Sequence, residues 1–526
     1  MNRLVLAGGL VLDGTGTPGY IADVTIQEDR IVSVTPVSDF HPGAIVQDIS
    51  HLAIAPGFID SHSHADNAPF LSEADQSKVL QGVTTEVVGN CGLSLAPRSS
   101  ANRDLLDGYL QRFFPVLDWK GDTFGDFLRR ADDAGYLVNY APLVGHGTLR
   151  VTAMGFEDRD PTSTQLSRLR ALVEEALDAG AIGLSTGLVY PPGRFAQTPE
   201  LIELARCLHG RPALYASHIR SEGRGRMAAV REAISIGREA DVRVQISHHK
   251  AMGRNHWGQV SDSLAEVRAA RTAGVDVRFD VYPYTASSTT LASCLPPELA
   301  GLDNDALMTE LRKPEVVDRL RHDLANEDWD NHVHQCGGFS GILITSTHDR
   351  QFESQTLEDV ASSLKTDGTG ALVNVLLAEH LRATMVCFAM SESDVETALS
   401  DDLTSIGSDG LAPGMPGTVH PRMWGTFPRV LGRYVREKGI LSLEEAIRRM
   451  TDLPATTFRL PNRGRIEAGY MADLVTFDPQ LVIDRATYLD SRLPPSGIND
   501  VIINGVKVVA DGRFRGMRAG RRLRAT

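Results

Sequence analysis

The chain has 526 residues, of which 42% are hydrophobic and 23% charged, and its 53 Lys and Arg against 67 Asp and Glu give a formal net charge of −14. A chain of this length and composition can bury a large core, which excludes the disordered, collagen-like and disulfide-stapled classes. The acidic excess repels phosphate groups, so we expect a small-molecule substrate as partner, with no nucleic acid and no membrane. The sequence makes no prediction of the oligomeric state.

The cysteines are five in number, at positions 91, 207, 294, 336 and 387, with irregular spacing and no CxxC pair. An odd number without a framework favours free thiols in a reducing compartment, so we expect a cytoplasmic protein. No run of 18 apolar residues is present to span a bilayer. The apolar stretch 4–12 is interrupted by two glycines and leads into a turn-rich segment, which predicts a β-strand rather than a signal peptide.

Both ends of the chain predict short β-strands separated by turns. Asn504-Gly505, between two of them, is a strong signal for a two-residue hairpin turn. Neither end has enough strands to close a core alone, so we expect residues 1–56 and 461–526 to build one small β-sandwich together. The predicted strands are 4–11, 22–27, 30–35, 472–477, 500–503 and 506–510.

The middle of the chain, residues 57–460, alternates short β-branched runs with longer amphipathic stretches, as repeated βα units do. The strand candidates are eight: 53–61, 85–90, 137–144, 181–185, 213–217, 242–247, 275–281 and 403–407. Eight units predict an α/β fold of the (β/α)8 TIM-barrel type. The excess length after strand seven predicts an insertion or lid at 291–349. An open doubly wound sheet is the alternative, and it is disfavoured because no glycine-rich phosphate loop follows the first strand.

Polar residues follow several predicted strands, at the rim where the active sites of such barrels form. His62 and His64, two residues apart, should point the same way from an extended chain. The same alternation places the side chains of His248 and Lys250 on one face of the strand and the side chain of His249 on the opposite, outward face. Thiolate and imidazole groups converging in this way favour zinc over magnesium or calcium. The residues at the strand ends are His62, His64, Cys91, His218, His248, Lys250 and Asp409.

These motifs resemble the N-acyl-D-amino-acid deacylase (D-aminoacylase) family of the amidohydrolase superfamily over essentially the whole chain. The matching segments run from Ala55-Pro56-Gly57-Phe58-Ile59-Asp60-Ser61-His62-Ser63-His64 through Gly89-Asn90-Cys91-Gly92, Ser185-Thr186-Gly187-Leu188-Val189-Tyr190, Ser217-His218-Ile219-Arg220, Ser247-His248-His249-Lys250, Tyr282-Pro283-Tyr284, Ser408-Asp409-Gly410 and His420-Pro421-Arg422 to Gly469-Tyr470-Met471-Ala472-Asp473. Where binuclear members of the superfamily present a carboxylated lysine, this chain has Ser185. The deacylase subgroup uses a cysteine as metal ligand instead, and Cys91 fits that pattern.

The resemblance implies a zinc ion held tightly by Cys91, His218 and His248, and a second, weaker position at His62 and His64 that Cys91 could bridge. Zinc lowers the pKa of water and polarises an amide carbonyl. Asp409 is the candidate general base that returns the proton to the leaving amine; its alternative role is a plain metal ligand. Lys250 offers a cation to the product carboxylate, and the resemblance adds Tyr190, Tyr282, Ser287 and Arg422 as substrate contacts.

We therefore expect zinc-dependent hydrolysis of the amide bond of N-acyl-D-amino acids, with the preference for the D enantiomer implied by the resemblance alone. The resemblance places the segment 285–298 beside the substrate side chain. Because the segment contains apolar residues but no Lys or Arg, we expect substrates with neutral, mainly hydrophobic side chains. The alternative is a cyclic-amide hydrolase of the dihydropyrimidinase, hydantoinase or dihydroorotase type, and a metal-free binding protein is a third hypothesis.

Three further features have weaker interpretations. His332 and His334 lie within the predicted insertion and are interpreted as surface or capping residues. His146 follows strand three and has either a structural role or a contact with the site. The arginine-rich tail 513–524 is expected to pair with acidic surface groups or with another subunit rather than with nucleic acid.

Overall fold

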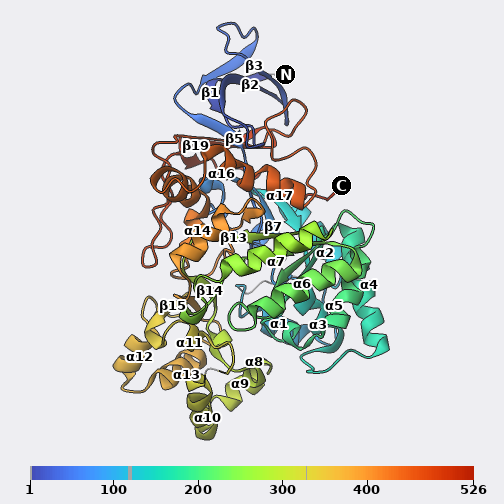
Figure 1. Ribbon diagram of the computed structural model, residues 1–526, viewed down its shortest axis with the longest axis vertical. Coiled ribbons are helices and arrows are strands. Elements are labelled where there is room, and N and C mark those ends of the chain that lie inside the picture. Colours follow the sequence, from blue (N-terminus) through green and yellow to red (C-terminus); the bar gives the residue numbers. More distant parts are fainter. Residues whose placement is uncertain (1–2, 116–120, 327) are drawn as a thin grey trace.

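The terminal segments of the chain form one sheet in the computed structural model, which describes residues 3–115, 121–326 and 328–526. The strands lie in the order β21-β20-β19-β18-β5-β1-β2-β3, and β4 pairs with β1. Figure 1 shows this sheet at one end of the molecule. The strands are β1 Arg3–Val11, β2 Tyr20–Gln27, β3 Arg30–Thr35, β4 Ala44–Asp48, β5 Ala53–Pro56, β18 Leu474–Phe477, β19 Ile498–Ile503, β20 Val506–Ala510 and β21 Arg513–Phe514.

The terminal strands predicted from the sequence are confirmed, and so is the hairpin between β19 and β20, which pair antiparallel. Asn504 and Gly505 have φ values of 48° and 80°. A turn with positive φ at both central residues matches the twist of the strands it joins. Asn and Gly tolerate that conformation, which is why the dipeptide marks the turn in the sequence.

The middle of the chain forms parallel strands whose carboxyl ends carry the candidate site residues. One sheet has the order β17-β13-β12-β11-β10-β9 and another the order β6-β7-β8. Hydrogen bonds join them at both sides, from Leu143 N to Val88 O at 2.9 Å and from Ser61 N to Ile406 O at 3.3 Å. The strands are β6 Phe58–Asp60, β7 Val83–Val88, β8 Asn139–Pro142, β9 Val144–Gly145, β10 Gly183–Gly187, β11 Leu214–His218, β12 Arg243–Ile246, β13 Val277–Val281 and β17 Thr404–Ile406.

Each predicted strand of this region overlaps an observed one, but the first is wrong as a single strand. Residues 53–56 are β5 of the terminal sheet, and only Phe58–Asp60 belongs to the parallel strands. Gly57 separates them, and a Cβ at this position would lie 2.1 Å from Cγ2 of Thr84. The chain therefore passes from one sheet to the other at a point where only glycine fits.

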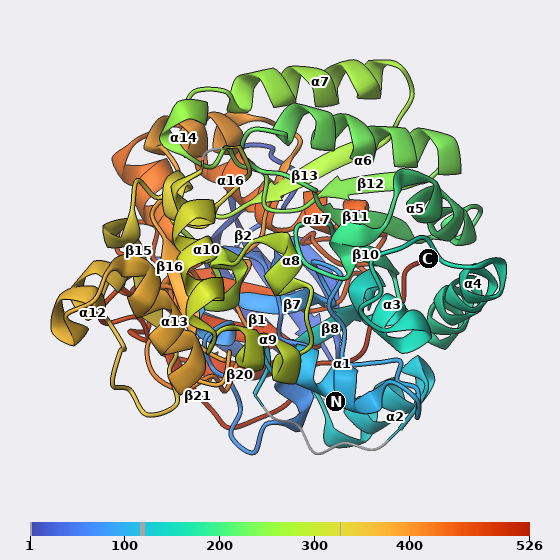
Figure 2. The ribbon, with the colours of Figure 1, turned by 90° about the horizontal axis from the view of Figure 1, so that it is seen from below.

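Helices surround the parallel strands (Figure 2). The helix α4 illustrates how the sequence specifies them: Thr162 and Gln165 form a capping box, and Leu169, Val173, Ala176 and Leu177 bury one face. The helices are α1 Arg103–Leu110, α2 Phe124–Ala134, α3 His146–Met154, α4 Ser163–Ala179, α5 Thr198–Ala205, α6 Arg226–Ala240, α7 Val260–Thr272, α14 Glu392–Ser400, α15 Arg422–Arg429, α16 Leu443–Met450 and α17 Asp452–Thr457.

The segment between β13 and α14 forms a small antiparallel sheet of order β14-β16-β15 with its own helices and its own buried apolar cluster. It lies at the opposite end of the molecule from the terminal sheet (Figure 1). The sheet runs from residue 287 to residue 387, so the predicted insertion, 291–349, covers only part of it. Its elements are β14 Ser287–Thr290, α8 Pro297–Ala300, α9 Asn304–Glu310, α10 Pro314–Ala325, α11 His332–Gln335, β15 Ile342–Thr345, α12 Leu357–Leu364, α13 Gly368–Ala378 and β16 Thr384–Cys387.

Within the described ranges, no helix is both long enough and apolar enough to cross a membrane. The arginine-rich tail pairs with acidic side chains: Arg521 with Asp29 at 2.7 Å and Arg522 with Asp132 at 2.8 Å. The expected pairing of the tail with acidic groups is confirmed within the chain itself.

Candidate active site

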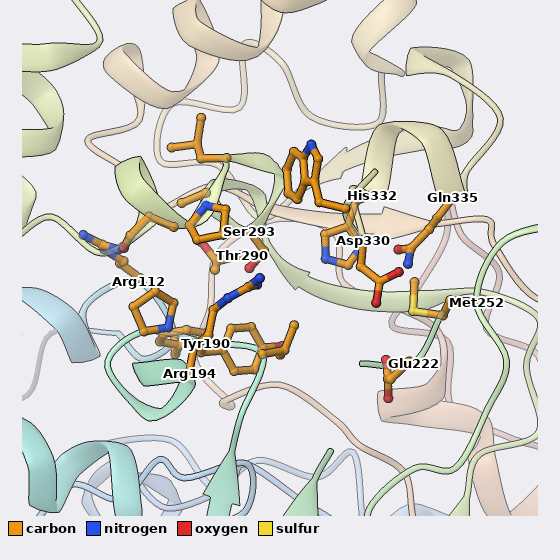
Figure 3. A pocket seen from close by; sticks show the side chains of 18 of the residues that line it. Arg112, Tyr190, Arg194, Glu222, Met252, Thr290, Ser293, Asp330, His332 and Gln335 are labelled. Carbon is orange, nitrogen blue, oxygen red and sulfur yellow. The ribbon is translucent and has the colours of Figure 1, made fainter. Parts of the chain in front are cut away.

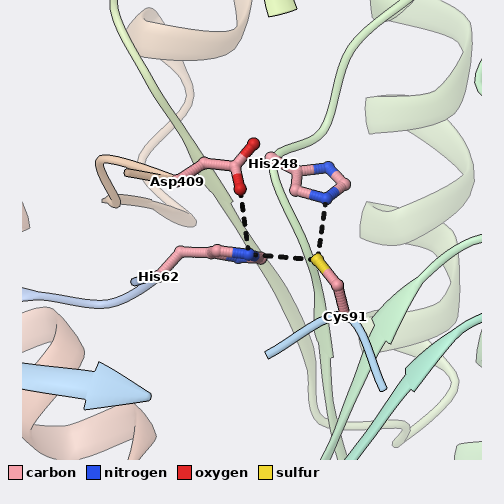
Figure 4. Close-up of side chains that lie close together, drawn as sticks. All are labelled: His62, Cys91, His248 and Asp409. Atoms are coloured by element: carbon pink, nitrogen blue, oxygen red, sulfur yellow. Dashed lines mark hydrogen bonds and ion pairs between the residues drawn. The ribbon is translucent and has the colours of Figure 1, made fainter. Parts of the chain in front are cut away.

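Cys91 lies at the centre of a cluster of buried ionisable side chains (Figure 4). It follows β7 in the left-handed conformation, with φ of 53°. Its Sγ is 3.3 Å from Nε2 of His62 and 3.4 Å from Nε2 of His248. Burial raises the pKa of the thiol, but the imidazoles of His62 and His248 outweigh burial and hold the pKa well below its usual range. The sulfur is therefore a thiolate, the form that binds metals.

His62 and His64 both face Asp409, so they point to the same place as predicted, but for a different reason. Oδ1 of Asp409 lies 3.4 Å from Nε2 of His62 and 3.2 Å from Nε2 of His64. The strand β6 ends at Asp60, before either histidine, so the loop rather than strand alternation sets their directions. A main-chain bond from Asp409 N to His62 O, 2.8 Å long, holds the two loops together.

His218 and His248 complete the cluster from the ends of β11 and β12. Nδ1 of His218 lies 2.9 Å from Nε2 of His248. His248 has φ of 37°, and its main-chain N–H donates to Oδ1 of Asp280 at 2.8 Å. His249 points away, with Nε2 2.7 Å from Oγ of Ser263 on α7. Burial lowers the pKa of His249 to about 3, so this ring is neutral and structural, as expected.

The donor atoms fit a soft divalent cation. One ligand atom each from His62, Cys91, His248 and Asp409 lies within 4.8 Å of the others, and His218, Glu222 and His248 form a second such group. Thiolate and imidazole ligands favour zinc, which takes four ligands in a compact arrangement. His64 has a buried Nδ1 with no hydrogen-bond partner among the described residues, although its Nε2 meets Asp409.

Lys250 and Glu222 form an ion pair beside the histidines. Nζ of Lys250 lies 2.5 Å from Oε1 of Glu222 and 2.8 Å from Nδ1 of His248. Oε1 of Glu222 is also 3.0 Å from His248 Nδ1. Burial raises the pKa of Glu222, but Lys250 and the two histidines, His218 and His248, bring it well below its usual range. Glu222 is thus a carboxylate that orients His248 from the side opposite Cys91.

The inner cavity opens onto this cluster. Of the predicted substrate contacts, Lys250, Tyr190 and Ser287 line it, together with His64, Cys91 and Asp409. Tyr190 forms a hydrogen bond with Thr289, with 2.9 Å between the hydroxyl oxygens.

Tyr282 and Arg422 lie behind the wall of the inner cavity. Nη1 of Arg422 lies 2.9 Å from Oδ2 of Asp409, and its Nη2 donates to Ser288 O at 3.0 Å. The guanidinium carbon is 4.6 Å from the ring centroid of Tyr282. A direct contact of either residue with substrate stays a prediction.

An outer cavity adjoins the inner one, and the two share Phe113, Val189, Tyr190, Glu222, Met252 and His332 in their walls. Figure 3 shows side chains around the outer cavity, with Arg112 and Arg194 among them. The interpretation of His332 as a surface or capping residue is wrong: it comes from α11 in the segment between β13 and α14, called the small domain below, and lines both cavities. His334 is exposed.

Sequence reasoning missed Glu222, Asp280 and the two cavity arginines. Asp280, on β13, accepts the main-chain N–H of His248, and its Oδ1 lies 3.2 Å from Nδ1 of His62. The rule that functional residues follow barrel strands could have found Asp280. Glu222 has the weaker signal of standing four residues after His218. His146 pairs with Glu200 at 2.9 Å, so its structural interpretation holds.

The comparisons with known proteins agree with this geometry. A model of the amidohydrolase family matches residues 46–277 and 295–510. The chain belongs to the amidohydrolase family. It is 39% identical to a D-aminoacylase of Alcaligenes xylosoxydans xylosoxydans, over 99% of this chain and 98% of the relative.

This amidohydrolase also resembles solved structures of deacylases. The N-acyl-D-glutamate deacylase of Bordetella bronchiseptica, solved with zinc and a phosphonate inhibitor that mimics the tetrahedral intermediate, is 35% identical, with a TM-score of 0.81 and 99% of each chain covered. A dihydropyrimidinase of Brevibacillus agri is 16% identical, with a TM-score of 0.58 and coverage of 100% of this chain and 99% of that one. The second likeness concerns the fold alone.

Proposed function

We propose that this amidohydrolase uses zinc to hydrolyse the amide bond of N-acyl-D-amino acids, releasing a carboxylate and the free D-amino acid. The observation that carries the proposal is the convergence of Cys91, His62, His248 and Asp409, with ligand atoms within 4.8 Å of one another, at the wall of a cavity that also holds Lys250. The deacylases that resemble the chain over nearly its whole length support the same reaction.

Cys91, His218 and His248 would hold the tightly bound zinc, and His62 with His64 a second, weaker position. Bound zinc supplies Lewis-acid polarisation of the amide carbonyl and activation of water near neutral pH. Glu222 and Asp280 orient the ligands: Glu222 meets Nδ1 of His248, and Asp280 accepts its main-chain N–H. Partners of this kind fix the direction and basicity of a metal-binding imidazole.

Asp409 would move the proton. Burial raises its pKa, but the guanidinium of Arg422 and the neighbouring histidines hold the pKa well below its usual range, so Asp409 is ionised at neutral pH. Its Oδ2 is held by Arg422, and its Oδ1 faces His62 and His64. Oδ1 would accept the proton of the attacking water and return it to the departing amine nitrogen.

Lys250, Tyr190 and Ser287 would orient the substrate. The ammonium of Lys250 lies in the wall of the inner cavity and would meet the α-carboxylate of the amino acid. The ordered hydrogen bond between Tyr190 and Thr289 fixes the phenol that lies across the cavity. Tyr282 and Arg422 would support this wall, Arg422 chiefly through Asp409.

The parallel strands would close into a (β/α)8 barrel, residues 57–460, and the one sheet of the terminal segments, 1–56 and 461–526, would fold back on itself as a β-sandwich. The hydrogen bonds between Ser61 and Ile406 and between Leu143 and Val88 support closure. The sheet of β14, β15 and β16 supports an insertion that is longer than 291–349. All five cysteines are free thiols, which supports the reducing, cytoplasmic location.

Neutral, mainly hydrophobic side chains are the proposed preference. Ala292, Leu295 and Pro297 line the outer cavity, as expected for the segment 285–298. Arg112 and Arg194 enter the same cavity from other segments, which sequence reasoning did not foresee. Arg112 is engaged: it donates to Asn304 Oδ1 at 2.8 Å and to Leu302 O at 3.0 Å.

The experiment is a turnover assay of zinc-loaded protein on paired D and L forms of N-acetylleucine, N-acetylphenylalanine and N-acetylglutamate, with amine release as readout. Hydrolysis of the D forms supports the proposal, and equal turnover of the L forms contradicts it. Dihydrouracil and hydantoin test the cyclic-amide alternative, and preferential opening of either ring would favour that reaction instead. Protein that retains no zinc and releases no amine would favour a binding protein.

A further inference from the structure

Arg194 stands out in the outer cavity because, among the described residues, none forms a hydrogen bond or an ion pair with its guanidinium. It lies in the short 3-10 helix Gly193–Phe195, four residues after Tyr190, and is half-buried. Its guanidinium makes no hydrogen bond or ion pair with any of the residues that the structure describes. In Figure 3 the Arg194 side chain extends into the cavity. A half-buried guanidinium stays charged, so its five N–H donors face the cavity unused.

The main chain that carries Arg194 is held firmly. Arg194 N donates to Tyr190 O at 2.8 Å, and Arg220 Nη1 donates to Arg194 O at 2.8 Å. Arg220 also bonds Ala196 O at 2.9 Å and the carboxylate of Glu232. The backbone is thus fixed on both sides while the side chain is left without a partner. Such an arrangement lowers the entropy lost when a ligand binds the guanidinium.

The acidic groups in the cavity wall are already engaged elsewhere. Asp330 accepts hydrogen bonds from the hydroxyl of Ser221 and, at 3.0 Å, from the main-chain N–H of Arg224. Glu222 is bound to Lys250 and His248. Neither carboxylate lies within ion-pair distance of Arg194, so neither neutralises its guanidinium directly.

The rest of the wall suits an apolar stem that ends in an acceptor. Val189, Met252, Leu295 and Trp329 line the cavity. Thr290 lines it too, and its buried Oγ1 has no hydrogen-bond partner among the described residues. An ionic hydrogen bond is stronger in such apolar surroundings than in water.

We propose that Arg194 forms a second carboxylate subsite, which binds a carboxylate carried by the substrate at a distance from the α-carboxylate. The proposal rests on the proposed deacylase function. The carboxylate could stand at the end of a dicarboxylic acyl group, which leaves the proposed preference for neutral side chains intact, or on the amino-acid side chain, which would overturn that preference; the binding chemistry is the same. A planar carboxylate fits a guanidinium through two parallel hydrogen bonds, and the Thr290 hydroxyl would donate a third.

The test compares acids with their neutral amide isosteres. N-acetyl-D-glutamate against N-acetyl-D-glutamine tests a side-chain carboxylate, and N-succinyl-D-leucine against N-succinamoyl-D-leucine tests an acyl carboxylate. One of the two acids is expected to exceed its amide about tenfold or more in kcat/KM, as a charge-assisted hydrogen bond allows. The acid that is preferred over its amide shows whether the bound carboxylate stands on the amino-acid side chain or on the acyl group.

The variant Arg194→Gln should lower this preference to about threefold or less, while turnover of neutral N-acetyl-D-leucine stays within about threefold. Arg194→Lys should retain part of the preference as a point charge. Because the Arg194 guanidinium has no partner among the residues that the structure describes, its removal should leave Tm unchanged. The control Arg211→Gln removes an exposed guanidinium paired with Asp178, outside both cavities, and should change neither ratio.

Three results would overturn the subsite. Neither acid has a higher kcat/KM than its amide, or the preference for the acid survives in Arg194→Gln, or Arg194→Gln lowers kcat/KM for acidic and neutral substrates by the same factor. Calorimetric binding of N-succinyl-D-leucine and N-acetyl-D-glutamate to Asp409→Asn protein, with and without Arg194→Gln, adds a readout without turnover. The affinity for one of the two acids should fall about tenfold when Arg194 is replaced by Gln. If neither acid binds more weakly after the replacement, the subsite is again overturned. Failure to release amine from N-acetyl-D-leucine contradicts the deacylase function separately.

Discussion

The guanidinium of Arg422 holds the carboxylate of Asp409 from behind: Nη1 lies 2.9 Å from Oδ2, and Arg422 is fully buried. Oδ1 of the same carboxylate is thereby left to face His62 and His64 at the cavity wall. The ion pair fixes the carboxylate direction that proton transfer needs.

Replacing the proposed base should stop turnover while leaving the metal in place. Asp409→Asn keeps the size of the side chain but removes its proton affinity, so kcat should fall by about 10²–10⁴. Zinc held by Cys91, His218 and His248 should remain. Steady-state kinetics and metal analysis of the same preparation measure both quantities. Near-wild-type turnover would show that another group moves the proton.

Arg422→Lys tests how Arg422 acts. A lysine supplies a point charge in place of the planar fork, so Asp409 should lose its fixed direction. We expect kcat to fall about tenfold because the ion-pair contact between Nη1 and Oδ2 of Asp409 is lost, with KM little changed. A rise in KM with kcat unchanged would instead show that Arg422 binds the substrate directly.

Cys91→Ser should abolish zinc retention. Serine replaces a thiolate whose lowered pKa suits metal binding with a neutral hydroxyl of similar size. The protein should therefore elute from gel filtration without stoichiometric zinc. Cys207→Ser is the matched control, since Cys207 is a half-buried free thiol outside both metal-ligand groups. Full zinc content in Cys91→Ser would remove the thiolate from the ligand set.

Glu222→Gln should weaken zinc binding about 10–100-fold, the usual effect of removing a carboxylate that orients a metal-binding histidine. The carboxylate lies 3.0 Å from Nδ1 of His248, and the amide of Gln cannot replace its charge. Competition with a chromophoric chelator measures the affinity. Glu266→Gln, which removes the surface partner of Arg231, serves as control. An unchanged zinc affinity would show that Glu222 pairs with Lys250 but does not support metal binding by His248.

Glu200 should stabilise the fold in a pH-dependent way. Burial raises its pKa, but His146 and Arg150 outweigh burial and leave the pKa below its usual value. A carboxyl with a lowered pKa stabilises above its unfolded pKa, about 4.3, and loses this effect as pH falls through the folded value. Glu200→Gln should thus cost about 3 kcal/mol at pH 7, because it leaves the buried Arg150 unpaired.

Thermal unfolding of wild type and Glu200→Gln at pH 7 and in a series from about pH 5 down to about pH 3 measures this difference. The gap in Tm should narrow on acidification, since wild-type Glu200 then approaches the neutral state that Gln imitates. A gap that stays constant would show that packing rather than charge accounts for the loss.

The fold and much of the candidate cluster follow from sequence because they depend on local patterns. Strands appear as β-branched runs. His218 ends β11, and Cys91 and His248 follow within a few residues of the ends of β7 and β12, so the chain order itself brings them to one rim. Asn504-Gly505 identifies its hairpin because few residues adopt positive φ twice in succession.

Residues that reach the site from longer loops escaped this reasoning. Glu222 stands in the loop before α6, and His332 comes from the small domain, so no spacing rule connects either to Cys91. Arg194 is recognisable only by what it lacks, a partner, and that is a property of three-dimensional packing. The segment 285–298 indicates an apolar cavity, but it carries no information about cations contributed by other segments.

Zinc titration of chelator-stripped protein, followed by release of D-leucine from N-acetyl-D-leucine, tests the central claim most directly. We predict no release without zinc, a rise in rate with the first equivalent per chain, and no rise in Cys91→Ala at any ratio. Full turnover by the stripped protein, or zinc-dependent turnover by Cys91→Ala equal to wild type, would contradict the account.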